Sequence, residues 1–251
     1  MKAIILAAGQ GNRMRKKTNN KPKCMLVYNN KTLINYTIEA MQKCNINDIV
    51  IINGYKSNKL EGHLKNEKVR FIKNNKYFET NMVYTFFCAE NEMNDDLIIS
   101  YSDIIYNKNI LNKLKKNSHD IAVVVDKNWR NLWEIRMENP LEDAETMKID
   151  NNGNIIELGK RAKDYSDING QYIGLIKISK NYINNIRKFY HNLDKNILYD
   201  GKSFNNMYMT SFIQLIIENL SNVNAEVING GWLEFDTEYD IINYAKNNLI
   251  I

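Results

Sequence analysis

The first part of the chain contains glycines and cations whose types and spacing suit phosphate binding. The apolar residues 3–8 lead into Gly9 and Gly11, and the basic side chains of Arg13 and Lys23 follow. Glycines leave backbone N–H groups accessible to an anion, because no Cβ atom stands in the way. Arginine adds a planar, permanently charged fork, and lysine adds a point charge. The segment therefore predicts a site for phosphate groups.

Two well-known phosphate-binding loops do not fit this segment. A dinucleotide-binding Rossmann loop has a third glycine, and an acid follows its second strand; residues 9–14 and 49–55 supply neither. A Walker loop needs Gly-Lys-Ser/Thr after its first glycine, and no such triplet follows Gly11. The segment is therefore neither a dinucleotide-binding Rossmann loop nor a Walker loop.

Length, composition and charge limit the class of protein. The 251 residues are 44% hydrophobic and show no internal repeat or linker, which predicts a single domain over residues 1–251. The net charge of +5 is mild and the lysines are scattered, so nucleic acid is not an expected partner. No apolar run is long enough to span a membrane. Three cysteines without metal-like spacing predict a cytoplasmic location, with no disulfide or zinc site.

Short apolar runs bounded by polar turns predict strands, and amphipathic patterns between them predict helices. Their alternation in the first half predicts an α/β fold with a mixed, mostly parallel central sheet and flanking helices. The turn at residues 151–154 lies between two alternating runs and predicts an antiparallel hairpin. The expected strands are 2–7, 48–53, 69–73, 97–102, 121–126, 145–150, 154–158, 172–178, 225–229 and 232–236, and the expected helices are 32–44, 179–190, 206–220 and 238–249.

The glycine segment and its continuation resemble the signature of the nucleotidyltransferase superfamily, which activates sugar phosphates and phospho-alcohols. LAAGQGNRM at residues 6–14 is followed by KPKCMLVYNNKTLINYTI at residues 21–38. The likeness spans nearly the whole chain and is greatest with bacterial choline-phosphate, phosphonate and phosphoglutamine cytidylyltransferases. It implies a Rossmann-like nucleotidyltransferase domain. It also implies a nucleotide site made by Leu6, Ala7, Ala8, Gly9, Gly11 and Asn81.

The same resemblance implies roles for four charged residues. Arg13 and Lys23 would hold the triphosphate, and Asp103 and Asp236 would bind Mg²⁺. Asp103 departs from the usual Gly-Asp pair, because Ser102 precedes it, whereas WLEFDT around Asp236 resembles the Trp-x-Glu-Ile-Asp-Thr ending of the relatives. Mg²⁺ is usually held by one or two carboxylates together with phosphate oxygens, so an aspartate pair suits it. Without the resemblance, either aspartate would read as a turn or helix-cap residue.

The chemistry of nucleotidyl transfer does not require a catalytic histidine. An acceptor phosphate is already anionic near neutral pH, because its second pKa is about 6. Catalysis then consists of aligning two anions and neutralising the charge that develops on pyrophosphate. The three histidines lie in polar stretches and are expected at the surface: His63, His119 and His191.

Residues 127–178, here called the 127–178 segment, are expected to bind the acceptor, as the corresponding elements do in the family. A quaternary ammonium favours aromatic faces and a carboxylate, whereas an amino-acid-like acceptor favours an arginine and an acid. The segment offers both sets. Its tryptophans at i, i+4 spacing are equally compatible with core packing. We expect Lys160 to contact the acceptor phosphate, and the acceptor-binding candidates are Trp129, Trp133, Glu145, Lys160 and Tyr172.

These features predict an enzyme that uses Mg²⁺ to transfer a cytidylyl group from CTP to a small phosphorylated acceptor, releasing pyrophosphate. The acceptor would be phosphocholine, a phosphonate or phosphoglutamine. The product would serve surface-polysaccharide (capsule) modification. The choice of base and the pathway rest on the resemblance alone. One alternative is a sugar-1-phosphate uridylyl- or thymidylyltransferase. Another is a non-catalytic relative that binds a nucleotide and regulates a partner, although the presence of all four charged residues favours an enzyme.

Overall fold

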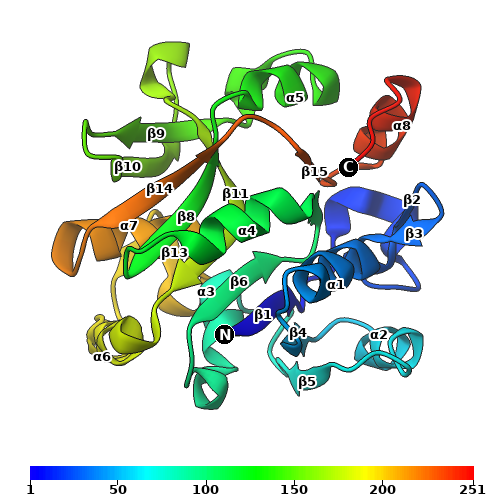
Figure 1. The fold of residues 1–251 in the computed structure, drawn as a ribbon, viewed down its shortest axis with the longest axis horizontal. Coiled ribbons are helices and arrows are strands. Elements are labelled where there is room, and N and C mark those ends of the chain that lie inside the picture. Colours follow the sequence, from blue (N-terminus) through cyan, green and yellow to red (C-terminus); the bar gives the residue numbers. More distant parts are fainter.

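A computed structural model describes residues 1–251, apart from the side chain of Arg15, and places one large sheet at the centre of the molecule (Figure 1). The strands of this sheet are β1 (Lys2–Ala7), β4 (Asp48–Asn53), β5 (Arg70–Lys73), β6 (Leu97–Tyr101), β8 (Ile121–Asp126), β9 (Glu145–Ile149), β10 (Asn154–Arg161), β11 (Gln171–Ile178) and β14 (Val223–Ile228). Their order is β5-β4-β1-β6-β11-β8-β14-β10-β9. Only β10 and β11 run against the other strands of this sheet. The mixed, mostly parallel α/β architecture expected from the sequence is confirmed.

Helices cover both faces of the sheet. They are α1 (Leu33–Lys43), α2 (Ser57–His63), α3 (Met82–Phe87), α4 (Lys108–Lys116), α5 (Trp129–Arg136), α6 (Ile183–Asn192), α7 (Met209–Asn219) and α8 (Glu238–Lys246). One core cluster contains buried residues of α1, α2, α4, α5 and α8, and the other contains those of α3, α6 and α7. Strand β1 serves both, because Ala3 and Ile5 face the first cluster while Ile4 and Leu6 face the second.

Three short antiparallel pairs lie outside the central sheet. They are β2 (Val27–Tyr28) with β3 (Lys31–Thr32), β7 (Ile104–Tyr106) with β15 (Trp232–Glu234), and β12 (Leu198–Tyr199) with β13 (Lys202–Ser203). The β7–β15 pair joins the middle of the chain to its last part. In that pair Glu234 lies opposite Ile104, and the N–H of Phe235 donates to the carbonyl of Asp103 at 2.9 Å.

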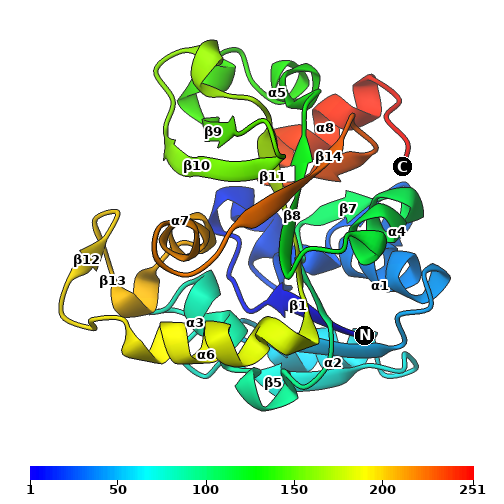
Figure 2. The ribbon, with the colours of Figure 1, turned by 60° about the vertical axis from the view of Figure 1, so that its left-hand side comes forward.

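The expected hairpin is present, with Ile149 of β9 opposite Ile155 of β10. Figure 2 shows it beside α7, where the side chain of Gln214 accepts a hydrogen bond from the backbone N–H of Leu158 at 2.9 Å. The helix expected at 206–220 begins only at Met209, because residues 204–206 form a separate 3-10 turn. In the part of the chain that the structure describes, no helix combines the length and apolar character needed to cross a bilayer.

Candidate active site

A cavity of about 300 Å³ opens where the carboxyl ends of β1 and β6 meet. Neighbouring parallel strands deliver the loops that follow them to the same edge of a sheet, which is where ligands bind in open α/β folds. The cavity brings together all the residues that the sequence assigned to the nucleotide and the four charged ones. Its lining consists of Leu6, Ala7, Ala8, Gly9, Gly11, Asn12, Arg13, Lys23, Cys24, Tyr77, Thr80, Asn81, Met82, Thr85, Ser102, Asp103 and Asp236.

Four charged side chains form one connected cluster in this cavity. Nζ of Lys23 lies 2.8 Å from Oδ2 of Asp103 and 2.8 Å from Oδ1 of Asp236. Nη1 of Arg13 lies 2.5 Å from the other carboxylate oxygen of Asp236. The Arg13 side chain is 67% exposed, whereas that of Asp236 is only 6% exposed. The cluster therefore runs from the buried floor of the cavity to the solvent.

Local structure explains how the cations reach this position. Gly11 precedes a 3-10 segment, Asn12–Thr18, and adopts a φ of 66°, which places it in the left-handed region that favours glycine. Pro22 immediately precedes a second 3-10 turn, Lys23–Met25, so that Lys23 is its first residue. The two 3-10 segments contact each other, and the lysine side chain lines the cavity.

The two aspartates arrive from opposite ends of the sequence. Asp103 follows β6, and Asp236 follows β15, whose pairing with β7 sets the two residues side by side. Burial favours the neutral form of Asp236, but the charges of Lys23 and Arg13 outweigh it, so the pKa of this carboxyl is lowered. Burial likewise opposes the charge of Lys23, yet Asp103 and Asp236 raise the pKa of its ammonium group. Both groups are therefore charged at neutral pH.

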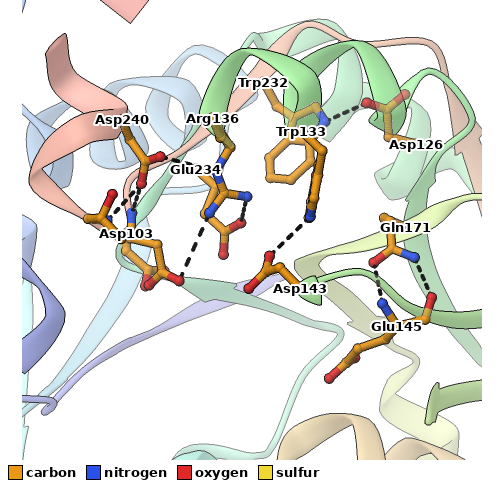
Figure 3. Close-up of polar contacts among 12 residues, drawn as sticks. Asp103, Asp126, Trp133, Arg136, Asp143, Glu145, Gln171, Trp232, Glu234 and Asp240 are labelled. Atoms are coloured by element: carbon orange, nitrogen blue, oxygen red, sulfur yellow. Dashed lines mark hydrogen bonds and ion pairs between the residues drawn. The ribbon is translucent and has the colours of Figure 1, made fainter. Parts of the chain in front are cut away.

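A second network of charged residues, centred on Arg136, holds the loop that carries Asp236 (Figure 3). Arg136, whose side chain is 2% exposed, places Nη1 2.6 Å from Glu234 and Nε 3.3 Å from Asp240. Asp240 accepts hydrogen bonds from the backbone N–H of Asp236 at 2.6 Å and of Thr237 at 2.7 Å. Arg136 belongs to the 127–178 segment that is expected to bind the acceptor; its side chain supports this loop and is not among the residues that line the cavity.

Asn81 lines the cavity, but part of its side chain is engaged elsewhere. Its Oδ1 accepts the N–H of Met82 at 2.8 Å and so caps α3, while its Nδ2 donates to the carbonyl of Asn206 at 3.4 Å. Of the other lining residues near Asn81, Tyr77 and Thr80 precede α3, whereas Met82 and Thr85 belong to it. No local pattern in the sequence pointed to these four residues.

The expected acceptor residues lie apart from this lining. Trp129 and Trp133 are buried in the core, with ring centroids 5.7 Å apart, and Nε1 of Trp133 donates to Asp143 at 3.0 Å. Lys160 is largely exposed, and its Nζ lies 3.3 Å from Glu157.

Tyr172 packs edge-on against Tyr101, with ring centroids 5.8 Å apart. Tyr101 in turn lies over Gly174, where a Cβ would come within 2.5 Å of the tyrosine ring and φ is 85°. Glu145 is half-buried, and burial, then the charges of Asp143 and Asp200, raise the pKa of its carboxyl to about 7.

The donor set of the cavity fits a hard divalent cation. The carboxylates of Asp103 and Asp236 both lie 2.8 Å from a single positive atom, Nζ of Lys23, so one cation between them contacts both. Among the described residues, no cluster of three or more His, Cys, Asp or Glu side chains forms a closed metal site. Two carboxylates with open positions match the preference of Mg²⁺ for few protein ligands, water and phosphate oxygens.

Comparison with known proteins agrees with this geometry. Residues 3–187 match the model of the MobA-like NTP transferase domain. The chain is 48% identical to CTP:phosphoglutamine cytidylyltransferase of Campylobacter jejuni, over 96% of this chain and 98% of that protein. It is 35% identical to choline-phosphate cytidylyltransferase of Streptococcus pneumoniae, over 47% of this chain and 52% of that protein.

A solved structure of CTP:phosphocholine cytidylyltransferase from Streptococcus pneumoniae has the same fold, with a TM-score of 0.71 and 21% identity over 99% of both chains. The superfamily resemblance seen in the glycine segment is thus confirmed over most of the sequence and over the whole fold. The chain belongs to the MobA-like NTP transferase family and is a nucleotidyltransferase.

Proposed function

We propose that this protein transfers the cytidylyl group of CTP to a small phosphorylated acceptor and releases pyrophosphate. One observation carries the proposal: in the cavity that the glycine segment lines, Nζ of Lys23 lies 2.8 Å from a carboxylate oxygen of Asp103 and 2.8 Å from one of Asp236. The relative that is 48% identical is a CTP:phosphoglutamine cytidylyltransferase, and it supports CTP as the nucleotide. In this proposal residues 1–251 act as one nucleotidyltransferase domain.

The residues of the cavity take separate roles. Leu6, Ala7, Ala8, Gly9, Gly11 and Asn81 would bind the nucleotide, with backbone groups near Ala7 and Ala8 facing the base. Arg13 and Lys23 would hold the triphosphate, where their charges offset that of the departing pyrophosphate. Mg²⁺, held by Asp103 and Asp236, would supply further charge neutralisation at the phosphates.

The reaction needs alignment more than proton transfer. An anionic oxygen of the acceptor phosphate attacks the α-phosphorus of CTP, and the bond from that phosphorus to the bridging oxygen of pyrophosphate breaks. No proton has to be removed from the acceptor near neutral pH, because the second pKa of a phosphate monoester is about 6. The residues of the cavity then act by holding two anions in line and by stabilising the leaving group.

The acceptor is proposed to bind in the 127–178 segment, with Glu145, Lys160 and Tyr172 as its contacts. A phosphoglutamine-type acceptor is favoured over phosphocholine, because the similarity to the phosphoglutamine enzyme covers 96% of this chain and that to the choline-phosphate enzyme covers 47%. Both tryptophans are buried, which leaves less aromatic surface for a choline box. A role in capsule or other surface-polysaccharide modification and a cytoplasmic location stay predictions.

Pyrophosphate release tests the proposal directly. CTP, UTP, dTTP, ATP and GTP would each be combined with phosphoglutamine, phosphocholine, 2-aminoethylphosphonate and glucose-1-phosphate in the presence of Mg²⁺. We expect release only with CTP and one amine-bearing acceptor. Asp103→Asn should keep the fold, shown by an unchanged circular dichroism spectrum, and lose turnover by at least ~100-fold.

The other outcomes of this panel separate the alternatives. Release with glucose-1-phosphate and UTP or dTTP would identify a sugar nucleotidyltransferase. Nucleotide binding without release from any pair would identify a regulatory relative. Full activity of Asp103→Asn would remove this residue from the reaction.

A further inference from the structure

Arg136 reaches three carboxylates, one on β15, one on the loop that carries Asp236 and one on α8, although it does not line the cavity. Its Nη1 lies 2.6 Å from Glu234, its Nε 3.3 Å from Asp240 and its Nη2 3.9 Å from Asp236 itself. The side chains of Arg136 and Asp240 are each 2% exposed. A planar guanidinium can make several such contacts at fixed angles, which an ammonium group cannot. Arg136 therefore contacts Asp236 and the two carboxylates on either side of it in the sequence.

Asp240 transmits this support to the backbone. Its Oδ2 accepts the N–H of Asp236 at 2.6 Å and that of Thr237 at 2.7 Å, and the Thr237 side chain completes a capping box at the start of α8. The other oxygen of the same carboxylate faces Nε of Arg136. One arginine thus fixes the carboxylate that in turn fixes the backbone of Asp236.

Arg136 also ends α5, which belongs to the 127–178 segment. Its guanidinium lies over the ring of Trp133, 4.8 Å from the centroid, and Nε1 of Trp133 donates to Asp143. Asn243 of α8 donates to the carbonyl of Ile135 at 2.9 Å, so the two helices are joined by a direct hydrogen bond as well. In Figure 3 Arg136 lies between Asp240 and Trp133, and Asp143 lies below Trp133.

We propose that Arg136 is a positioning residue for the transfer reaction. Through Asp240 it sets the backbone at Asp236, and through Trp133 it ties that aspartate to the segment assigned to the acceptor. The proposal rests on the proposed function. It extends that function by explaining how Asp236 and the 127–178 segment keep their positions relative to each other. In this role Arg136 touches neither the nucleotide nor the acceptor.

The test compares Arg136→Met and Arg136→Lys with Arg187→Met. Arg187 lies on α6, outside the cavity and the 127–178 segment, is 37% exposed and pairs with Glu90, so it provides a control for the loss of an arginine ion pair. At a temperature where every variant is folded, we expect kcat of Arg136→Met to fall by ~100-fold, because a displacement of about 1 Å in a reacting group costs that much. The KM for CTP should change by less than ~3-fold, since Arg136 contacts none of the residues assigned to the base or the triphosphate. Arg136→Lys should recover part of kcat, and Arg187→Met should match the parent protein.

A purely structural role would give a different result. Arg136→Met would then lower the melting temperature while kcat stayed within ~2-fold of the parent, and this would overturn the proposal. Should Arg136→Met fail to fold, Asp240→Asn provides the second measurement. It keeps an acceptor for the two N–H groups and removes the charge that Arg136 holds, so kcat should fall by ~10-fold with the fold retained. Parent-like kcat in Asp240→Asn would equally contradict the proposal.

Failure of the proposed function would be visible separately. The parent protein would then release no pyrophosphate with any nucleotide and acceptor. In that case the binding of Mn²⁺, followed by electron paramagnetic resonance, takes the place of turnover. Arg136→Met should weaken it by ~10-fold, because Asp236 no longer has a fixed position, and Arg187→Met should leave it unchanged. Equal Mn²⁺ binding by all three proteins would overturn the positioning role.

Discussion

A Cβ atom on Gly11 would stand 2.8 Å from the Cβ of Lys23, so the turn at residue 11 is packed directly on the lysine that bridges the two aspartates. Gly11 also has a φ of 66°, which other L-residues rarely adopt. Two independent constraints therefore require glycine here. The turn therefore exposes backbone N–H groups and also fixes the position of the Lys23 side chain at its Cβ.

Replacing Gly11 by alanine should displace Lys23. We expect Gly11→Ala to lower the free energy of unfolding by about 1–2 kcal/mol, because of the strained φ and the close contact. Turnover should fall by at least ~10-fold as Nζ of Lys23 moves from its place between the aspartates. Urea unfolding and pyrophosphate release measure the two effects.

Gly62→Ala serves as the matched control. Gly62 lies in α2, and a Cβ there would meet no atom within 4 Å. Alanine should stabilise that helix by roughly 0.5–1 kcal/mol and leave turnover unchanged. Normal turnover in Gly11→Ala would show that the contact with Lys23 has no bearing on the reaction.

Lys23 occupies the place between two carboxylates where a divalent cation would also be favoured. Lys23→Met should therefore bind Mn²⁺ more tightly in the absence of nucleotide, by ~10-fold, because the competing ammonium is gone and two close carboxylates are left without it. The same variant should lose turnover by at least ~100-fold, since the triphosphate loses a charge partner.

Titration of Mn²⁺ by electron paramagnetic resonance or calorimetry gives the affinity. Lys17→Met, which removes an exposed lysine of the same segment, should alter neither quantity. If Lys23→Met bound Mn²⁺ no better than the parent protein, Asp103 and Asp236 would not be a metal pair.

Trp133 tests whether the tryptophans of the 127–178 segment belong to the core or to the acceptor. Its ring is buried against Trp129 and Trp232, so Trp133→Phe should cost about 1–2 kcal/mol of unfolding free energy through lost packing and the lost hydrogen bond to Asp143. The KM for the acceptor should change by less than ~3-fold.

Asp143→Asn separates the two contributions, because it keeps the ring and weakens only the hydrogen bond. It should lose less stability than Trp133→Phe. A large rise in acceptor KM with unchanged stability in Trp133→Phe would instead place the indole ring against the acceptor.

Glu145 should make stability depend on pH. The pKa of its carboxyl in the folded protein is raised from its ordinary value to about 7, so the folded state binds more protons than the unfolded state between about pH 4.5 and 7. The free energy of unfolding should therefore fall as the pH rises through this window, by roughly 1–2 kcal/mol for a half-buried group.

Urea unfolding at pH 5, 6, 7 and 8 measures this slope. Glu145→Gln should flatten it, and Glu142→Gln, at an exposed position nearby, should retain it. Parallel slopes in the parent protein and Glu145→Gln would assign the pH dependence to another group.

Local patterns were enough to predict the main strands and the phosphate-binding end of β1. Strand β1 is a short, largely apolar run that is followed by Gly9 and Gly11, and this local pattern indicates a strand and the loop after it. Asp103 and Asp236 were singled out through the family resemblance of the stretches around them, because without it either would read as a turn or helix-cap residue. Strand β7, by contrast, is three residues long and is stabilised by β15 from the other end of the chain, so no window of sequence around residue 104 reveals it.

The partners of Arg136 were equally hidden from the sequence. Its three carboxylates lie about a hundred positions away, and only tertiary packing brings them together. The burial of Trp129 and Trp133 was undecided for a similar reason, since i, i+4 spacing defines a helix face but not what covers it. Residues that contact a ligand through local loops are thus easier to predict than residues that hold those loops in place.

The ion pair between Lys23 and Asp236 joins positions 213 residues apart, and it has a consequence for how the protein is made. Lys23 leaves the ribosome early, whereas its second carboxylate partner follows only after β15 has been synthesised. Contacts between such distant positions form late in folding, because a long loop has to close first. A nascent chain can therefore build much of its sheet while the transfer centre is still incomplete, and catalytic competence should appear only with the docking of α8.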